Sequence, residues 1–259
     1  MRAIDTHVHL DDPAFIEGAA AVWQEARRAG VEGAIAVGVE PATWSRTLAV
    51  ARGLPGVRVA LGIHPQAVPA LDDETIGRAL ADLPALLGDH GAVAIGECGL
   101  DGPAGDLDRQ GRVLREQLAL ARDLALPVSL HVFRVHGPAL KLLRDLGPLP
   151  AGGVVHSYSG SAELVRDYLR LGWSFSFAGA VTRSNAKRPL AAALAVPLDH
   201  LLVETDAPFQ PTGADARDRT RGEPRDLPEV IGALARARGL DPEELAETTT
   251  ANARRIFRL

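Results

Sequence analysis

Two histidines near the amino terminus, His7 and His9, are separated by a single residue. Side chains two residues apart in a strand point to the same face, so both imidazoles can reach one point, as the ligands of a divalent metal must. Two histidines alone could also share a packed or solvated face by chance. The pair therefore predicts a metal site at the end of a first strand only if further donors join it.

Further donors do occur, each at the carboxyl end of an apolar run. They are His64, Glu97, His131, His156, Glu204 and Asp206. Ionisable side chains in such positions are costly to bury unless they bind a metal ion or pair with another group. One shared metal centre would account for all of them.

The order of the apolar runs predicts the fold. Strand patterns occur near residues 3–10, 33–39, 58–64, 92–98, 127–133, 153–158, 173–178 and 201–206, and helical stretches follow them. Eight strands alternating with helices predict one α/β domain over residues 1–259, a TIM-type (β/α)8 barrel with the metal site at the carboxyl ends of its strands. An open doubly wound sheet is the alternative, but it would not bring ligands from so many strands to one centre.

Local signals place some of the boundaries. Asp12 followed by Pro13 predicts the amino end of the first helix, and Gly30 predicts its carboxyl end. The stretch 210–226 is rich in Arg, Asp, Gly and Pro, which predicts a long active-site loop after the eighth strand.

The composition is ordinary for a globular enzyme, with 46% hydrophobic and 24% charged residues. No apolar run approaches the roughly 18 residues of a membrane span. The first residues lead directly into a strand, so we expect no signal peptide, and a single cysteine, Cys98, fits a reducing cytoplasm. Strand alternation turns Cys98 away from the pocket if Glu97 faces it, so we expect Cys98 to pack in the core.

Other catalytic schemes lack their motifs. The chain has no G-x-S-x-G elbow, no G-x-x-x-x-G-K loop and no G-x-G-x-x-G turn. One large group of barrel hydrolases bridges two metals through a modified lysine on the fourth strand. The two lysines of this chain, Lys141 and Lys187, fall in helical stretches, so neither can take that role. Glu97 stands at that point instead, and a carboxylate can bridge two cations unaided.

Eight short motifs form a highly specific combination over nearly the whole chain. They are DTHVHLD (5–11), GIHP (62–65), GECGLD (96–101), LPVSLH (126–131), HSYSG (156–160), ETDAP (204–208), RGEP (221–224) and NARRIF (252–257). With these motifs the chain resembles the TatD-type metal-dependent deoxyribonucleases, a family of amidohydrolase-like barrels.

The resemblance implies a dinuclear metal centre and hydrolysis of phosphodiester bonds in DNA. One cation would bind His7, His9 and Asp206, the other would bind His131 and His156, and Glu97 would lie between them. This donor set accepts zinc, manganese, iron or magnesium, so we expect two divalent ions without assigning their identity. Asp206 and Glu97 are the catalytic candidates, and Asp206 is the expected acceptor of the attacking water's proton.

Four residues are candidates for contact with the substrate: His64, Arg134, Glu204 and Arg221. The fifth strand departs from the H-x-R of most members, because its histidine, His131, begins an H-x-x-R-x-H pattern that ends at His136. Gly102 and Pro103 also stand where an aromatic residue is usual. Contacts with phosphate, sugar and base should therefore differ from those of most relatives.

The charge of the chain limits how it could hold DNA. A net charge of -5 and a pI near 5.9 lack the broad basic surface of a tight duplex binder. Within 215–226, the arginines are matched by aspartates and a glutamate. We therefore expect weak, local contacts suited to strand ends, single strands or damaged sites, no membrane partner, and a monomer or small homo-oligomer.

Two other functions fit the same pattern. One is a barrel hydrolase of small phosphoesters or C–N bonds, although the missing fourth-strand lysine removes one branch of that group. The other is a protein that keeps the fold for binding and has lost catalysis, which the complete set of ligands argues against.

Overall fold

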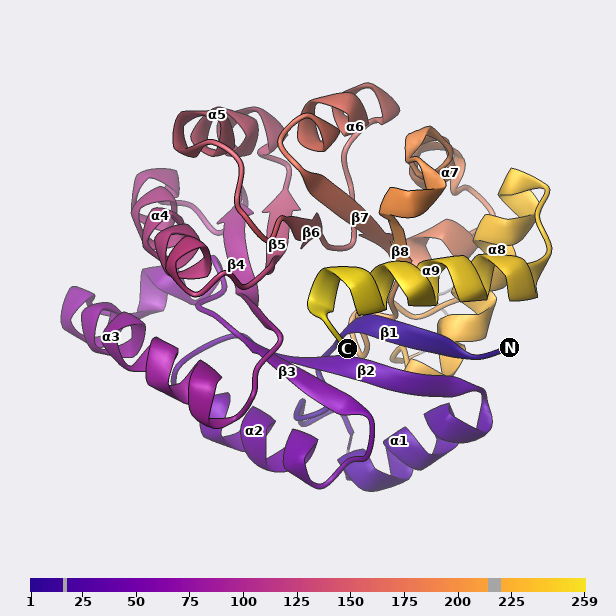
Figure 1. Cartoon of the computed structure of the whole chain (residues 1–259), viewed down its shortest axis with the longest axis horizontal. Coiled ribbons are helices and arrows are strands. Elements are labelled where there is room, and N and C mark those ends of the chain that lie inside the picture. The colour runs from indigo at the N-terminus through magenta and orange to yellow at the C-terminus, as the bar shows by residue number, and fades with distance from the viewer. Residues whose placement is uncertain (16–17, 214–219) are drawn as a thin grey trace.

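The computed structural model describes residues 1–15, 18–213 and 220–259. Eight parallel strands pair in chain order around a barrel (Figure 1). Their bounds are β1 Ala3–Val8, β2 Val31–Gly38, β3 Val57–Leu61, β4 Ala94–Asp101, β5 Val128–Phe133, β6 Gly153–Val155, β7 Trp173–Phe177 and β8 Leu201–Val203. The predicted TIM-type (β/α)8 barrel is confirmed.

The first and last strands are joined just beyond the end of β8. The Asp206 backbone N–H donates to the His7 carbonyl at 3.0 Å, and the His9 N–H donates to the Ala207 carbonyl at 2.9 Å. The Thr6 hydroxyl also donates to the Val203 carbonyl at 3.1 Å. The residues that close the barrel are therefore neighbours of three expected metal ligands.

Helices follow the strands, and all except the last, α9, surround them in an outer ring (Figure 1). They are α1 Ala19–Arg28, α2 Trp44–Arg52, α3 Asp73–Asp89, α4 Leu107–Asp123, α5 His136–Leu146, α6 Ala162–Leu169, α7 Lys187–Ala195, α8 Leu227–Arg238 and α9 Pro242–Phe257, with short 3-10 turns η1 Val68–Ala70, η2 Gly179–Thr182, η3 Leu198–His200 and η5 Pro224–Asp226. Aspartate side chains accept hydrogen bonds from backbone N–H groups in the first turns of α3, α4 and α9.

The first helix begins later than the sequence predicts. Asp12 accepts a hydrogen bond from the Ala14 N–H at 2.7 Å, a local turn, and α1 begins at Ala19 after Gly18. Phe15, expected on the helix, lies in the preceding loop and is buried in the core. Asp12 and Pro13 are turn formers as well as helix starters, so their pattern alone does not separate the two.

The barrel is filled from its amino-terminal end by apolar side chains. Strand residues such as Ile35, Val37 and Leu202 form one buried cluster with Ile256 and Phe257 of α9. Figure 1 shows α9 lying across the barrel rather than in the outer ring. Helix α9 therefore closes the bottom of the barrel, as side-chain layers do in other barrels of this type.

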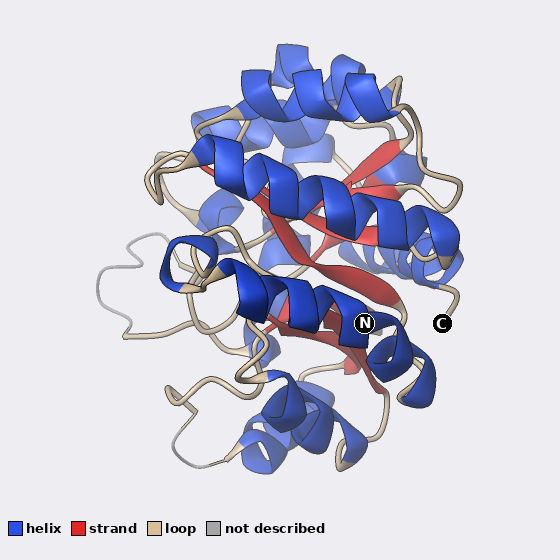
Figure 2. Ribbon diagram, turned by 90° about the vertical axis from the view of Figure 1, so that its left-hand side faces the viewer, coloured by secondary structure: helices blue, strands red, loops and turns tan. Residues whose placement is uncertain are grey.

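The opposite end of the barrel carries the loops that follow the strands, and both termini lie towards the amino-terminal end (Figure 2). Part of the predicted loop 210–226 lies outside the described residues, including the arginines and aspartates at 215–219. In the described part of the chain, no helix has the length and apolar character to cross a membrane.

We expect Phe257→Ala to destabilise the protein by about 3–5 kcal/mol, because it would leave a cavity under the barrel where the side chain is now 2% exposed. A urea denaturation curve measures this change. Leu259→Ala is the matched control at the same end, since Leu259 is 37% exposed and should change stability little. Equal losses in both variants would show that α9 does not seal the barrel.

Candidate active site

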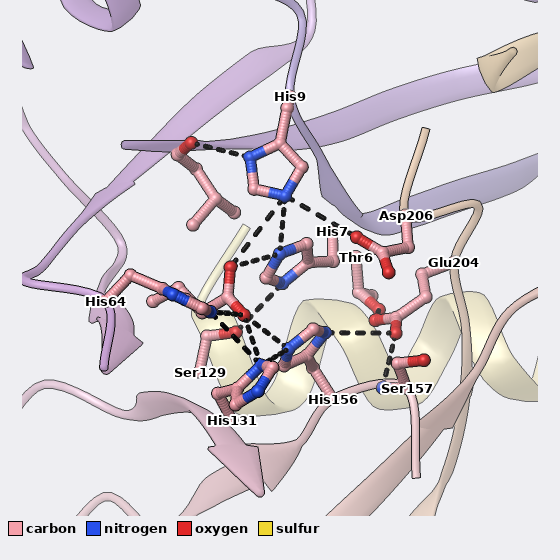
Figure 3. Close-up of polar contacts among 12 residues, drawn as sticks. Thr6, His7, His9, His64, Ser129, His131, His156, Ser157, Glu204 and Asp206 are labelled. Atoms are coloured by element: carbon pink, nitrogen blue, oxygen red, sulfur yellow. Dashed lines mark hydrogen bonds and ion pairs between the residues drawn. The ribbon is translucent and has the colours of Figure 1, made fainter. Parts of the chain in front are cut away.

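Six of the residues expected to bind metal meet at the carboxyl end of the barrel (Figure 3). They are His7, His9, Glu97, His131, His156 and Asp206, and they come from or directly follow β1, β4, β5, β6 and β8. All are buried except His131, which is partly exposed. The structure thus brings together residues that span 200 positions of the sequence.

A β-bulge in each of two strands turns the key side chains into the barrel. Between the pairs Asp5–Ala34 and Val8–Ala36, β1 advances three residues while β2 advances two. A bulge reverses strand alternation beyond it, so His7 faces inward although it is an odd number of residues from the inward-facing Ile4. Strand β4 has the same irregularity between Ile95 and Cys98, where it turns Glu97 inward.

The outward orientation of Cys98 follows from the same bulge. Cys98 is fully buried in the cluster between strands and helices, and burial raises the pKa of its thiol. The expectation that Cys98 packs in the core is confirmed.

Glu97 is at the centre of the site. Its Oε2 lies 3.2 Å from His7 Nε2 and 3.8 Å from His9 Nε2. Its Oε1 lies 2.8 Å from His131 Nδ1 and 2.6 Å from His156 Nε2. The two carboxylate oxygens thus face two different pairs of histidines.

The neighbouring strand must approach Glu97 closely. At Gly62, directly after β3, an added Cβ would lie 2.7 Å from the Glu97 carbonyl oxygen. Only glycine allows this approach, which also places His64 beside the cluster.

Metal-binding capacity follows from the donor atoms. Three sets lie with their atoms within 4.8 Å of one another: His7, His156 and Asp206; His7, His9 and Glu97; and His64, Glu97 and His131. Imidazole nitrogen and carboxylate oxygen are the usual ligands of zinc and related divalent ions. The site therefore has the donor atoms to bind a divalent cation.

Acceptors lie beside the outer nitrogens of three histidines, and for His9 and His131 they are at hydrogen-bond distance. His9 Nδ1 lies 3.2 Å from the Val37 carbonyl, and His131 Nε2 lies 3.1 Å from Asp101 Oδ2. His156 Nδ1 lies 3.5 Å from Glu204 Oε1. An imidazole that donates its outer N–H presents a lone pair inward, which is the tautomer that metal binding needs.

His64 presents the opposite tautomer. The Gln66 backbone N–H donates to His64 Nδ1 at 3.1 Å, so the ring proton resides on Nε2. That N–H points into the cluster, 2.9 Å from Glu97 Oε1. Burial lowers the pKa of His64, so the ring is neutral with a single inward donor.

The ionisation states suit a cation site. Burial alone would raise the pKa of Glu97, but His64, His156 and His7 hold it well below its usual range. Burial likewise opposes ionisation of Asp206, yet nearby histidines lower its pKa. Both carboxylates are therefore charged at neutral pH, as metal ligands must be.

Asp206 is fixed by residues that the sequence did not single out. Gln210 donates to Asp206 Oδ2 at 2.9 Å and also contacts the Ser157 hydroxyl. Gln210 lies in a loop, where no periodic pattern marks its direction. Asp101, which accepts from His131, is the last residue of the GECGLD motif, and its place at the end of β4 is a signal that could have found it.

A second buried carboxylate, Asp5, joins β1 to the segment after β8. Asp5 accepts hydrogen bonds from the Thr205 N–H at 3.0 Å, the Thr205 hydroxyl at 2.6 Å and the His7 N–H at 3.2 Å. Burial raises the pKa of Asp5 to about 7 against the effect of these bonds. Asp5 thus sets the spacing of the strand ends that carry His7 and Asp206.

Glu204 is completely buried beneath His156. Its Oε1 accepts from the Ser157 N–H at 2.6 Å, and its Oε2 accepts from the Thr6 hydroxyl at 3.4 Å. Glu204 therefore lies where it can support His156, and its side chain is not exposed to the cleft.

The two candidate arginines lie away from the cluster. Arg134 is exposed, with its guanidinium 5.0 Å from the centre of the Phe133 ring. Arg221 pairs with Glu223 at 3.1 Å and lies 5.2 Å from the centre of the Phe15 ring. Their contact with substrate stays a prediction.

The second histidine of the H-x-x-R-x-H pattern, His136, contacts Tyr168 Oη at 3.0 Å. Burial and the charge of Arg188 lower its pKa to about 4. It supports an aromatic wall behind the site and is a neutral structural residue. His90, before β4, is exposed, and His200, before β8, is partly exposed, so both lie at the amino-terminal end of the barrel.

Two cavities adjoin the cluster, and His131, His156 and Asp206 line both. The first, of about 330 Å³, opens between the ends of β5, β6 and β7, and we name it the β5–β7 pocket. The second, of about 590 Å³, lies over the ends of β1, β2 and β3, and we name it the β1–β3 pocket. A substrate bound at the cluster could therefore extend in two directions.

Known proteins resemble this chain over its whole length. A family model described as "TatD related DNase" matches residues 4–258. The uncharacterized metal-dependent hydrolase YabD of Bacillus subtilis is 33% identical over 257 residues, 98% of each chain. The 3'-5' ssDNA/RNA exonuclease TatD of Cronobacter sakazakii is 38% identical over 242 residues, 90% of this chain and 89% of that protein.

A solved structure agrees with the architecture. The crystal structure of YjjV, a TatD homolog from Escherichia coli, superposes with a TM-score of 0.89 at 33% identity, covering 100% of this chain and 98% of that one.

We expect Thr205→Val to lower the free energy of unfolding by about 1–3 kcal/mol, because it removes a hydroxyl donor from the buried Asp5 carboxylate. Urea denaturation of the metal-free protein measures this loss. The control is Thr249→Val, a buried threonine whose hydroxyl bonds only to carbonyls of its own helix. Similar small losses in both variants would contradict a joining role for Asp5.

Proposed function

Because this chain belongs to the TatD related DNase family, we propose that it is a two-metal hydrolase that cleaves phosphodiester bonds at the ends of single-stranded nucleic acid. Several relatives carry the name 3'-5' ssDNA/RNA exonuclease, which supports a single-stranded substrate and cleavage from its 3' end. We also propose that residues 1–259 form one domain, which acts in the cytoplasm as a monomer or small homo-oligomer.

The observation that carries the proposal is the division of Glu97 between two pairs of histidines. Its Oε2 faces His7 and His9, and its Oε1 faces His131 and His156. We assign one divalent cation to His7, His9 and Asp206, a second to His131 and His156, and the bridge to Glu97. The inward lone pairs of the histidines fit this assignment.

Two divalent cations at these residues would lower the pKa of a bound water towards about 7 and stabilise charge on the phosphoryl oxygens. The ionised Asp206 carboxylate, held by Gln210, is in place to accept a proton from the attacking water. Glu204 and Asp101 keep His156 and His131 oriented by binding their outer nitrogens.

His64 supplies a donor to the substrate. Its Nε2–H points into the cluster, where a phosphoryl oxygen could accept it. The exposed Arg134 is a candidate for a more distant phosphate. Arg221, paired with Glu223, is a further candidate for contact with substrate.

The charge of the chain favours an end-directed nuclease over a duplex binder. A net charge of -5 leaves few cations to follow a long phosphate backbone. Single strands and ends require contact with only a few phosphates. Hydrolysis of small phosphoesters or C–N bonds is the alternative, and parallel assays with such compounds would separate it.

We expect the purified protein to bind close to two divalent ions, and Glu97→Ala to lower occupancy of both sites, because each site loses one of its carboxylate oxygens. Elemental analysis and calorimetric titration with zinc or manganese measure occupancy without any assay of activity. Glu163→Ala, an exposed glutamate on α6, is the control and should leave occupancy unchanged. Loss of one ion only would contradict the bridge.

Asp206→Asn should reduce hydrolysis of a short single-stranded oligonucleotide by at least about 10²-fold, because the amide cannot accept the proton and is a poorer ligand. The change alters little volume, so circular dichroism and the melting curve should match the unmodified protein. Near-normal turnover in the variant would contradict the proposed role of Asp206 as proton acceptor and metal ligand.

A further inference from the structure

The β5–β7 pocket has a preformed aromatic wall. Tyr158 makes edge-to-face contacts with Phe175 and Phe177, at centroid distances of 5.0 and 6.1 Å, and its hydroxyl donates to the Ser161 carbonyl at 2.9 Å. At Gly160 an added Cβ would lie 2.3 Å from the Tyr158 hydroxyl, so glycine is required for the ring to lie there. The wall is therefore rigid.

The size and lining of this pocket suit one nucleoside. Its volume of about 330 Å³ is near the lower end of small-molecule sites, which span roughly 300–1,000 Å³. Phe133, 37% exposed, adds an aromatic side chain to the pocket beside the cluster, with the Arg134 guanidinium over one face of its ring. Aromatic surfaces of this kind bind bases of single strands by stacking, with little sequence preference.

The rim of the β5–β7 pocket is basic. Arg183 follows η2, Arg188 lies in the first turn of α7, and both are exposed and line the pocket. Within the part of the chain that the structure describes, neither has a carboxylate partner within ion-pair distance. Arginines in this state can bind phosphate without first breaking an ion pair.

The β1–β3 pocket has the opposite charge. Asp11, Asp12 and Glu40 line it. Its arginine, Arg46, already lies 3.4 Å from Asp11 Oδ2. Carboxylates facing a cleft repel phosphate, so this half disfavours a continuing nucleic-acid backbone.

We propose that the cleft divides a single-stranded substrate by charge. The β5–β7 pocket holds the penultimate nucleoside. The phosphate on the side of this nucleoside away from the scissile bond binds Arg183 and Arg188. The β1–β3 pocket admits a terminal nucleotide that carries no further phosphate. This inference rests on the proposed function, and it assigns end selectivity to the two sets of side chains that flank the cluster.

The first test uses oligonucleotides and the double variant Arg183→Ala/Arg188→Ala. In the metal-loaded wild type, replacing the phosphate on the far side of the penultimate nucleoside with neutral methylphosphonate should raise KM about tenfold. With the normal substrate, the double variant should have a KM about tenfold above that of the wild type. Replacing the same phosphate with methylphosphonate should not raise the KM of the double variant further. Arg112→Ala, an exposed arginine on α4, is the control for net charge and should behave as wild type.

The second test fills the pocket from its partly exposed rim with Ala180→Trp. Removing the penultimate base should weaken wild-type binding about tenfold, since stacking contributes roughly that factor or more per base. The variant should bind normal and abasic strands equally. Its melting curve establishes folding, and the arginine test stands independently if this variant does not fold.

The third test concerns the acidic half. A 3'-phosphate on the terminal nucleotide should lower kcat/KM at least about tenfold in wild type, and Asp12→Asn/Glu40→Gln should recover much of that loss. Equal cutting of 3'-hydroxyl and 3'-phosphate ends by wild type would overturn the role of the acids.

Fluorescence anisotropy of a labelled oligonucleotide with metal-free protein separates this inference from the proposed function. Binding that depends on Arg183 and Arg188, with no hydrolysis after metal loading, would support the pocket and refute the nuclease. Hydrolysis that is indifferent to both arginines and to methylphosphonate would refute the pocket and leave the nuclease standing.

Discussion

The structure depends on one buried charge, the carboxylate of Glu97. A lone carboxylate in the interior of a barrel would be strongly destabilised by loss of hydration. Here four imidazoles lie within 3.2 Å of its oxygens and hold it ionised. These rings crowd one another as well, with His7 Nε2 3.3 Å from His9 Nε2 and His131 Nδ1 3.2 Å from His156 Nε2. A divalent cation bound between these nitrogens would replace their protons as the positive charge beside Glu97, so the same constraint that orders the interior creates the site.

The hydrogen bonds outside this cluster also hold the barrel together. Asp5 connects β1 to Thr205 beyond β8, and Glu204 connects the same segment to Ser157 after β6. These contacts close the sheet and, through the adjacent backbone, set the positions of His7 and Asp206. Site geometry and barrel closure are therefore one network, in which these buried polar side chains bind one another or the backbone.

Function at this end of the barrel is divided among side chains from different loops. The cluster lies between a basic, aromatic pocket and an acidic one, and it lines both. Small net charge would not reveal this division, because arginines and carboxylates cancel in the total. The local separation of charge can still orient a flexible polyanion, since electrostatic interactions act most strongly over distances of about a Debye length or less, roughly 8–10 Å.

The amino-acid pattern alone predicts the barrel and the set of polar residues at the ends of its strands. Apolar periodicity and turn chemistry are local properties, and in a closed parallel barrel every strand ends at the same rim, so ligand convergence followed from topology. Tertiary structure alone decided which face each side chain takes. The bulges in β1 and β4 reverse the alternation that a two-residue period predicts. Gly96, with a φ of 139°, is a residue type that marks the bulge in β4, whereas no glycine marks the one in β1. The tertiary structure also determines the tautomer of His64, through Gln66, and the contact of Gln210 with Asp206. It determines the start of α1 at Ala19 as well. A local sequence pattern does not predict these features.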